Sequence, residues 1–194
     1  MARPASDTRN RILETVEKQL RRPGPKRMTM DTVASEAGCA KGLITYHFRT
    51  KSDLLASVAE RMSQERETRW SAALSAPNPE AAIGQSWHLI TVEVSTGFFR
   101  AWMGLASIGD KVTVRTVNNV SASFCNTVAV SVNQFLTQIG LAPSVSSDEL
   151  GHLFAAAVQG FEMQLFSGIP SSRVASAHDA LWVAILSLTR PAAS

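Results

Sequence analysis

Five side chains that can donate hydrogen bonds or carry positive charge lie close together in the first third of the chain. They are Lys41, Thr45, Tyr46, His47 and Lys51. Ammonium, hydroxyl and imidazole groups are the donors with which proteins hold DNA phosphates and read the edges of bases. This segment is therefore suited to binding nucleic acid, a chemistry in which no covalent bond is made or broken.

A short predicted helix precedes these donors. Between Thr29 and Gly38 the apolar residues recur at the spacing of one helical stripe, as Met30, Val33, Ala34 and Ala37. The hydroxyl of Thr29 can accept a hydrogen bond at the beginning of that helix. Gly38 follows its last residue, where the left-handed backbone conformation costs glycine least. This ending predicts a tight turn into a second helix.

The second short helix is expected to begin near Ala40 or Lys41. Its inward residues are expected to be Leu43, Ile44 and Phe48, and its outward residues Gly42, Thr45, Tyr46 and His47. In a helix-turn-helix, the N-terminal part of the second helix contacts base edges while the first helix crosses the DNA backbone. The predicted base-reading residues are Lys41, Gly42 and Thr45, and the predicted phosphate contacts are Thr29, Tyr46, His47 and Lys51. Leu43 completes the predicted DNA-binding set.

The segment from about Met28 to Leu55 resembles the DNA-binding signature of the tetracycline-repressor (TetR) family of bacterial transcriptional regulators. The residues that carry the resemblance are Thr29, Ala37, Gly38, Lys41, Gly42, Tyr46, His47, Phe48, Lys51, Asp53, Leu54 and Leu55. Two positions depart from the family pattern. Ala40 stands where a capping Ser or Thr is frequent, and Thr45 stands where many relatives have an aromatic residue. Because of these departures, the sequence of the DNA operator stays open.

The resemblance implies an all-α fold with two domains. Residues 1–51 would form a three-helix DNA-binding domain, with a linker helix from residue 52. Residues 52–194 would form a helical domain for ligand binding and dimerisation. The resemblance also implies a two-fold homodimer bound to a double-stranded DNA operator.

The distribution of charge agrees with a phosphate-facing N-terminal part. The 194 residues carry a net charge of only +3, but residues 1–51 carry +6 and residues 52–194 carry −3. The basic loop from Arg21 to Arg27 is either a solvated turn or a second phosphate contact, and Arg3 in the N-terminal arm is expected to reach toward a groove. With 45% hydrophobic and 18% charged residues, the chain is not a disordered tail.

Enzymatic and metal-binding functions find little support in the sequence. The four histidines are scattered, and no zinc-protease, nucleophile-elbow, phosphate-loop or dinucleotide motif is present. Two cysteines, Cys39 and Cys125, are too few for a disulfide framework or a zinc site. We therefore expect no cofactor and no metal. A small helical hydrolase remains an alternative, but it would need a nucleophile and a base brought together only by folding.

A cytoplasmic location is expected. No signal segment opens the chain, and the longest apolar run, Ala180 to Leu186, is too short to span a bilayer.

A long helix is predicted from Ser52 to about Leu74, with Thr50 or Ser52 as its cap. Lys51 and the free N–H groups at its N-terminus would together hold a phosphate. The stretch from Glu60 to Arg69 alternates in charge and is expected to be exposed to solvent. This helix would join the DNA-binding domain to the C-terminal domain.

Five further helices are predicted in the C-terminal part. Their approximate ranges are 80–95, 98–108, 112–139, 148–166 and 171–189. Aromatic residues in the first three of these predict a pocket for a small, largely apolar or aromatic molecule. The predicted pocket residues are Trp87, His88, Thr91, Phe98, Phe99, Trp102, Met103, Phe124 and Asn126, with Glu93 and Arg100 as polar anchors. The alternative for each residue is ordinary core packing.

The last two helices are predicted to form a four-helix bundle with the same helices of a second chain. The predicted interface residues are Leu150, Phe154, Val158, Phe161, Leu165, Leu181, Trp182 and Ile185. His152 and His178 are expected at the surface or at this interface. A helix pair buried within one subunit is the alternative.

These features together predict a ligand-responsive, homodimeric transcriptional repressor that a small molecule releases from a palindromic operator. A helical protein-interaction module, whose basic head binds an acidic partner, is an alternative of a different class. Salt-sensitive binding to specific duplexes would favour the regulator.

Overall fold

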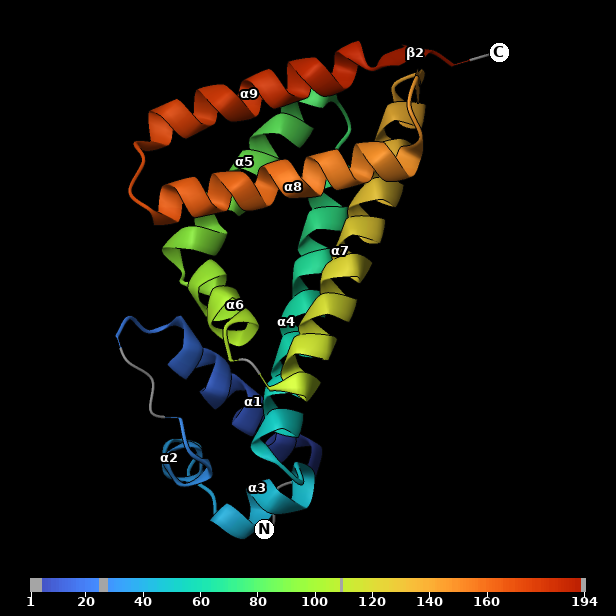
Figure 1. Ribbon diagram of the computed structural model, residues 1–194. Helices are drawn as coiled ribbons and strands as arrows, with labels where there is room; N and C mark the ends of the chain where they lie inside the picture. The colour runs from blue at the N-terminus through green and yellow to red at the C-terminus, as the bar shows by residue number, and fades with distance from the viewer. Residues whose placement is uncertain (1–4, 25–27, 109, 193–194) are drawn as a thin grey trace. The chain divides into compact units, whose positions relative to one another are not determined.

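The computed structural model describes residues 5–24, 28–108 and 110–192, and this part of the chain is helical apart from one pair of short strands (Figure 1). The helices are α1 (Ala5–Arg21), α2 (Met30–Glu36), α3 (Lys41–His47), α4 (Lys51–Leu74), α5 (Pro79–Ser95), α6 (Phe98–Ala106), α7 (Lys111–Gln138), α8 (Ser147–Phe166) and α9 (Ser171–Ser187). The predicted all-α fold is confirmed. Helical periodicity located the helices from α4 to α9 to within a few residues of their observed ends.

The chain divides into two compact units. Unit 1 comprises Met1–Met62 and Gly97–Val120, and unit 2 comprises Ser63–Thr96 and Ser121–Ser194. Helices α4 and α7 each begin in unit 1 and end in unit 2. The functional domains predicted from the sequence, 1–51 and 52–194, are a different kind of division and stay a prediction.

Unit 1 has its core around the apolar stripe of α1. Ile12, Leu13, Val16 and Leu20 are buried, together with the inward side chains of α2, α3 and α6. Gly97 precedes α6 with φ of 75°, and a Cβ at this position would lie 2.6 Å from the carbonyl oxygen of Arg21. Only glycine fits there, because both the backbone conformation and the space exclude a side chain.

Unit 2 has a core of aromatic rings that meet edge to face. Trp70 of α4 contacts Phe124 of α7 and Phe154 of α8, with ring centroids 6.1 and 5.9 Å apart. Phe154 continues to Trp182 of α9 at 5.5 Å, and Trp182 to Phe135 of α7 at 5.9 Å. Edge-to-face pairs at these separations are favourable, so the rings connect four helices through one continuous core.

Two short strands in unit 2 were not predicted. β1 (Leu141–Pro143) pairs in antiparallel fashion with β2 (Thr189–Pro191), and Ala142 lies opposite Arg190. The pairing connects the end of α7 to the end of α9. Strands of three residues that contain proline carry no periodic signal, which is why the sequence did not indicate them.

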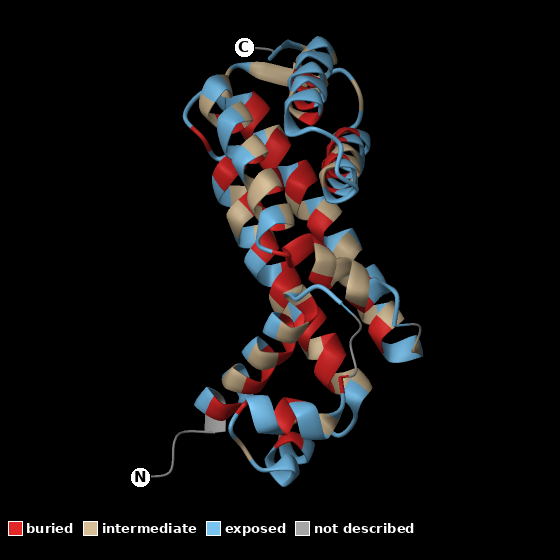
Figure 2. Ribbon diagram, turned by 90° about the vertical axis from the view of Figure 1, so that its left-hand side faces the viewer, coloured by how far each residue is buried: buried red, intermediate tan, exposed pale blue. Residues whose placement is uncertain are grey.

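The exposed surface predicted for Glu60 to Arg69 is wrong in part. Figure 2 shows buried and exposed residues alternating along the helices, and in α4 the buried set includes Ser63 and Arg66. The alternating charges of this stretch suggested an exposed surface, but the charge of Arg66 is balanced by Glu93 and Glu162 on other helices. The residue types predicted Ser171 or Ser172 as the cap of α9, but Pro170 occupies the N-cap position, and no side chain there accepts a hydrogen bond.

Among the described residues, no helix is both long and apolar enough to cross a membrane.

Candidate nucleic-acid interface

The first helix of the turn, α2, is fixed at its N-terminus by a capping box. The Thr29 hydroxyl accepts a hydrogen bond from the backbone N–H of Thr32 at 3.1 Å. The Thr32 hydroxyl in turn accepts one from the backbone N–H of Thr29 at 3.0 Å. These two bonds satisfy donors that a helix end leaves free. The predicted cap at Thr29 is confirmed, but the partner residue is a threonine in place of the usual glutamate or glutamine.

The turn between α2 and α3 is built around Gly38. Its φ is 60°. The N–H of Gly38 donates to the carbonyl oxygen of Ser35 at 3.3 Å, and the N–H of Cys39 donates to the carbonyl oxygen of Ala34 at 3.0 Å. This pair of bonds is the Schellman motif, which ends a helix on a left-handed residue. The predicted role of Gly38 is confirmed.

Helix α3 begins without a side-chain cap. Ala40 occupies the N-cap position with an extended backbone, and no side chain accepts a hydrogen bond from the first turn. The first backbone N–H groups of a helix have no partner within the helix, and they point along its axis toward its N-terminal side. The departure from the family pattern at Ala40 therefore leaves α3 held mainly by packing.

Packing of α3 depends on two buried side chains. Ile44 is fully buried and Phe48 is 3% exposed, and both belong to the core of unit 1. Leu43 was expected to point inward as well, but it is 37% exposed. Residue 43 lies beside residue 44 on the helix, so it is turned by about 100° from the buried face.

The outward face of α3 presents most of the predicted DNA-binding side chains. Tyr46 is 77% exposed, and Lys41, Gly42 and Thr45 are exposed too. His47 is half-buried, and its Nε2 is buried with no hydrogen-bond partner among the described residues. Because Nε2 of His47 is buried, it is less accessible to a DNA phosphate than the predicted contact supposed.

An ion pair connects the two helices on this face. The Lys41 ammonium lies 2.9 Å from Oδ2 of Asp31, a residue of α2, and both side chains are more than half exposed. Asp31 was not among the residues predicted at this face. Its position in the first turn of α2 could have indicated the contact, since the Gly38 turn brings the beginnings of α2 and α3 close enough for this ion pair.

The N-terminus of α4 adds a second exposed lysine, Lys51, to the predicted DNA-binding residues of α3. Thr50 and Asp53 form a reciprocal cap, with the N–H of Asp53 donating to the Thr50 hydroxyl at 3.1 Å and the N–H of Thr50 donating to the Asp53 carboxylate at 3.0 Å. The cap at Thr50 is confirmed. Lys51 is the first residue of α4 and is exposed, so its ammonium is accessible beside the helix N-terminus.

Other predicted phosphate contacts fall partly outside the described residues. Arg3 and residues 25–27 of the basic loop belong to this group. Arg22 is described and pairs with Glu36 at 3.3 Å. Arg9 lies with its guanidinium carbon 5.3 Å from the centroid of the Phe48 ring, which adds a cation to the α3 side of unit 1.

The predicted pocket residues are divided between the two units. Phe98, Phe99, Trp102 and Met103 belong to unit 1, where Phe98 and Phe99 are buried. The remaining residues, in unit 2, are Trp87, His88, Thr91, Phe124 and Asn126. Phe124 is 2% exposed and supports the side chain of Arg66, and Glu93, expected as an anchor, is also bound to Arg66. Asn126 is exposed. A pocket made of these residues stays a prediction.

His88 lines a groove between α4 and α5 in unit 2. The other lining residues are Arg69, Ala72, Ala73, Gln85 and Leu89. Its apolar wall and three polar side chains are of the kinds that line small-molecule sites. No group of three His, Cys, Asp or Glu side chains arranged to hold a metal ion occurs in the described part of the chain.

Most side chains predicted at the dimer interface are buried within the single chain. Leu150, Phe154, Val158, Phe161, Trp182 and Ile185 are at most 7% exposed, whereas Leu165 and Leu181 are half-buried. The buried six hold α8 and α9 in the core of unit 2, where a partner chain cannot reach them. The periodicity identified the inner stripe of each helix. The outer stripe carries other apolar side chains, which include Leu153, Met163 and Val183.

His178 was expected at a surface or interface and is 1% exposed. Its Nε2 lies 2.9 Å from the Ser86 hydroxyl oxygen, and Trp182 Nε1 donates to the same nitrogen at 3.2 Å. A serine beside a histidine is the pair that a hydrolase would need. Ser86 is fully buried, however, so a substrate cannot reach its hydroxyl group. The pair therefore satisfies polar groups in the core, and burial lowers the pKa of His178 in spite of the nearby Asp179 carboxylate.

Comparison with known proteins locates the same segment. Residues 12–58 match the family model described as bacterial regulatory proteins, tetR family. These residues contain α2, the glycine turn, α3 and the beginning of α4. A search of curated proteins gives no significant match.

Solved structures share the fold over nearly the whole chain at low sequence identity. A putative TetR-family transcriptional regulator from Rhodococcus sp. is 16% identical, with a TM-score of 0.73, and the match covers 93% of this chain and 99% of that one. A TetR-family regulator from Agrobacterium tumefaciens is 19% identical, with a TM-score of 0.70 and coverage of 94% and 99%. A putative transcriptional regulator from Saccharomonospora viridis, solved in complex with choline, is 20% identical, with a TM-score of 0.68 and coverage of 90% and 95%.

Proposed function

We propose that this chain, which belongs to the TetR family of DNA-binding transcriptional regulators, is a homodimeric repressor that a small molecule releases from a palindromic operator. Regulators of this family are transcription factors rather than enzymes, and they usually dimerise and bind small-molecule effectors. The observation that carries the proposal is the outward face of α3, where Lys41, Thr45 and Tyr46 are exposed beside the exposed Lys51 of α4.

The DNA half of the proposal assigns a role to each part of this face. Lys41, Gly42 and Thr45, in the first turns of α3, would meet base edges in the major groove. Tyr46 and Lys51, together with Thr29, would hold phosphates and fix the register of the helix on the duplex. Lys41 would exchange its contact with Asp31 for a base or phosphate contact at little cost, because exposed ion pairs contribute about 0–1 kcal/mol.

The homodimer would use the outer faces of α8 and α9. On α9, Ala180, Val183 and Ala184 are exposed at helical spacing, and Val183 is 69% exposed. On α8, Leu153 and Met163 are 44% and 40% exposed. Neighbouring exposed apolar side chains on two packed helices are typical of an interaction surface. A two-fold dimer presents two recognition helices to half-sites about 34 Å apart, or at a multiple of that spacing, so the operator would be palindromic.

The effector would bind in unit 2, and the groove that includes Arg69, Gln85 and His88 supports this. We propose that the effector is a small, largely apolar or aromatic molecule, and a cation held by the faces of aromatic rings is one form of it. Choline, which is bound in the Saccharomonospora viridis structure, is a small organic cation. Helix α4 carries both Lys51 and Arg69, so it connects the DNA contacts covalently to the groove. A ligand that prefers one conformation of unit 2 would shift the population of DNA-binding dimers by its difference in affinity. Such a regulator would act in the cytoplasm.

The experiment that tests the DNA half compares three variants. Lys51→Ala should weaken binding to all duplexes and lower the slope of log K against log salt by about one. Lys41→Ala should reduce the discrimination between operator and random duplex. Arg190→Ala removes an exposed charge from β2, outside the proposed DNA and dimer surfaces, and is the matched control, which should leave both quantities unchanged. Fluorescence anisotropy at several salt concentrations measures all three.

Full-strength binding by both lysine variants would refute this assignment of residues. Indifference of the wild-type protein to duplex DNA would favour the alternative, in which the basic head binds an acidic protein.

A further inference from the structure

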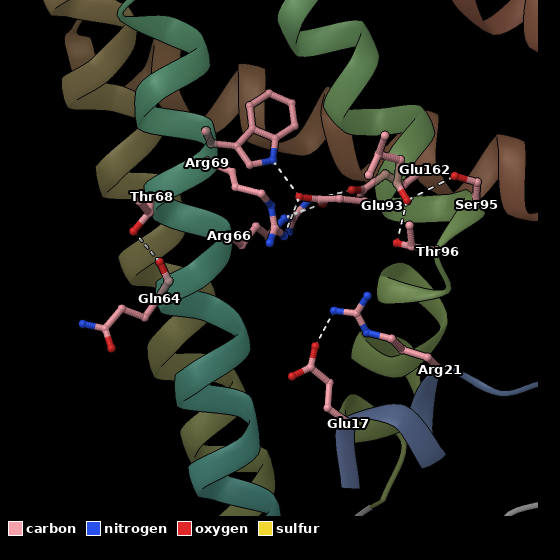
Figure 3. A network of polar contacts seen from close by, with 12 residues as sticks. Glu17, Arg21, Gln64, Arg66, Thr68, Arg69, Glu93, Ser95, Thr96 and Glu162 are labelled. Atoms are coloured by element: carbon pink, nitrogen blue, oxygen red, sulfur yellow. Dashed lines mark hydrogen bonds and ion pairs between the residues drawn. The ribbon is translucent and has the colours of Figure 1, made fainter. Parts of the chain in front are cut away.

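Two carboxylates share one guanidinium group inside unit 2 (Figure 3). Nε of Arg66 on α4 donates to Glu93 of α5 at 2.8 Å. Nη2 of the same arginine donates to both carboxylate oxygens of Glu162 on α8, at 2.8 and 3.0 Å. The Arg66 side chain therefore joins three helices, and both of its partners are far from it in sequence.

These three side chains are almost completely removed from water. The side chains of Arg66, Glu93 and Glu162 are 5%, 1% and 2% exposed. The ring of Phe124 from α7 lies 4.1 Å from the guanidinium carbon of Arg66, and Trp70 donates its indole N–H to Glu93 at 3.0 Å. Ionised groups in such surroundings are costly unless opposite charges balance them.

Arg66 is a single buried cation shared by two buried carboxylates. A second cation, Arg69, lies 3.5 Å from Glu93, but its side chain is 36% exposed, so water screens its charge more than that of Arg66. Arg66 contributes one positive charge, and the two glutamates contribute two negative charges when both are ionised. Burial raises the pKa of Glu162 well above its ordinary value, and the neighbouring Glu93 carboxylate raises it further, although Arg66 opposes the shift. Burial would raise the pKa of Glu93 too, but Arg66, a hydrogen bond with Glu162, Arg69 and the Trp70 indole together lower it. Because the pKa of Glu162 is raised and the pKa of Glu93 is lowered, a proton shared by the two carboxylates belongs mainly to Glu162.

Other helices add few charges near Glu162. From α4, Arg69 lies 3.5 Å from Glu93 with a side chain that is 36% exposed, and Arg66 makes the contacts described above. Helix α7 contributes the Cys125 thiol, whose pKa is raised by burial. On α9, the ring of His178 lies 6.0 Å from the ring of Phe161, the residue before Glu162, and His178 is already bonded to Ser86 and Trp182.

We propose that Arg66, Glu93 and Glu162 form a proton-dependent clamp, which holds α8 against α4 and α5 while the two carboxylates share a proton and loosens when both are ionised. The proton moves between Glu162 and solvent, and no other group is consumed. In the closed form the protonated Glu162 donates to Glu93, and the guanidinium group bonds to both. In the open form two buried negative charges share Arg66, and the partly exposed Arg69 pairs with Glu93, so repulsion between the carboxylates weakens the contact between α8 and α5.

The clamp makes a signed prediction for the dependence of stability on pH. Glu162 in the unfolded chain loses its proton near pH 4.3, the ordinary value for glutamate. Between that pH and the folded pKa of Glu162, the folded state holds one proton more than the unfolded state. The unfolding equilibrium constant should therefore rise by up to about tenfold for each pH unit in this window, and should become independent of this group above it.

The test compares urea unfolding of the wild-type full chain with that of Glu162→Gln from pH 5 to 9. Glutamine replaces the protonated carboxyl with a neutral group that still donates, so this variant should lack the alkaline loss of stability. The difference between the two curves isolates Glu162 from His178, which titrates with the opposite sign. Asp148→Asn on the same helix is the matched control, because Asp148 is exposed and its removal should leave the pH dependence unchanged.

Parallel curves for wild type and Glu162→Gln would overturn the clamp. A second measurement keeps the proposal testable if the glutamine variant does not fold. Carbon-13 NMR of the side-chain carboxyl carbons in the wild-type protein should show Glu162 titrating well above about 4.3, the ordinary value for glutamate. Titration of Glu162 near that ordinary value would equally refute the proposal.

Discussion

Gly151 shows how strictly a single position can be determined by packing. A Cβ built there would lie 2.2 Å from Cβ and 2.5 Å from Cα of Ala129, so α8 and α7 approach too closely for any side chain. Gly151→Ala should lower the free energy of unfolding by about 1–3 kcal/mol, the usual cost of overpacking a core. Urea denaturation at constant pH measures the change.

Gly160 on the same helix provides the control. No atom lies within 4 Å of a Cβ built at that position, so Gly160→Ala should be neutral or stabilise the helix by up to about 1 kcal/mol. Equal effects of the two substitutions would contradict the close packing of α7 and α8.

His178 makes a prediction about acid stability. Burial lowers its pKa, so the folded state disfavours the protonated ring. The stability that the neutral ring contributes is complete above the unfolded value of about 6.5, and is lost as the pH falls through the folded pKa. His178→Gln cannot take up this proton, so its stability should fall less between pH 7 and pH 5. Thermal unfolding at both pH values tests this, and an equal fall in both proteins would contradict it.

Single residues also show where sequence analysis stopped. Ile44 and Phe48 were predicted to face the core because apolar residues recur at helical spacing, and both are buried. Arg66 and His178 were expected at surfaces, because polar residues are usually solvated. Their partners, Glu93 and Glu162 for Arg66 and Ser86 for His178, come from other helices, and helical periodicity contains no information about such distant pairs.

At the scale of elements, α3 has a weakness that its sequence predicts. Ala40 has the extended backbone of an N-cap but no side chain that can accept a hydrogen bond. Ala40→Ser should therefore stabilise the protein by about 1 kcal/mol, as measured by thermal unfolding. Thr29→Ala, which removes the capping box of α2, should shift the stability in the opposite direction. A serine variant no more stable than wild type would indicate that α3 does not need this bond.

Most elements were predictable, because helix signals are local. Thr29, Gly38 and Thr50 have the cap or turn roles that their residue types indicate. The β1–β2 pair was missed, since it joins three-residue segments that are distant in sequence. On α8 and α9 the sequence predicted one apolar stripe on each helix as the interface, and the folded chain buries most of that stripe and exposes other apolar residues such as Leu153 and Val183.

At the scale of the whole molecule, the proposed dimer depends on those outer stripes. Val183→Glu places a charge in the centre of the exposed α9 stripe and should dissociate the dimer at micromolar concentration, because an unpaired buried charge is costly. Sedimentation velocity measures the result. Arg190→Glu, at an exposed site in β2 outside α8 and α9, is a control for charge alone and should leave the oligomeric state unchanged. A Val183→Glu protein that stays dimeric would exclude this face as the interface.

The central claim is that the exposed face of α3 reads a specific palindromic operator as part of a two-fold dimer. Selection of bound sequences from a random duplex library, with the purified protein at moderate salt, tests this claim most directly. We expect an enriched palindrome whose half-sites are centred about 10 base pairs apart or at a multiple of that spacing. Weak, salt-dependent binding without any enriched sequence would contradict the claim, and would leave unit 1 as a basic surface without sequence preference.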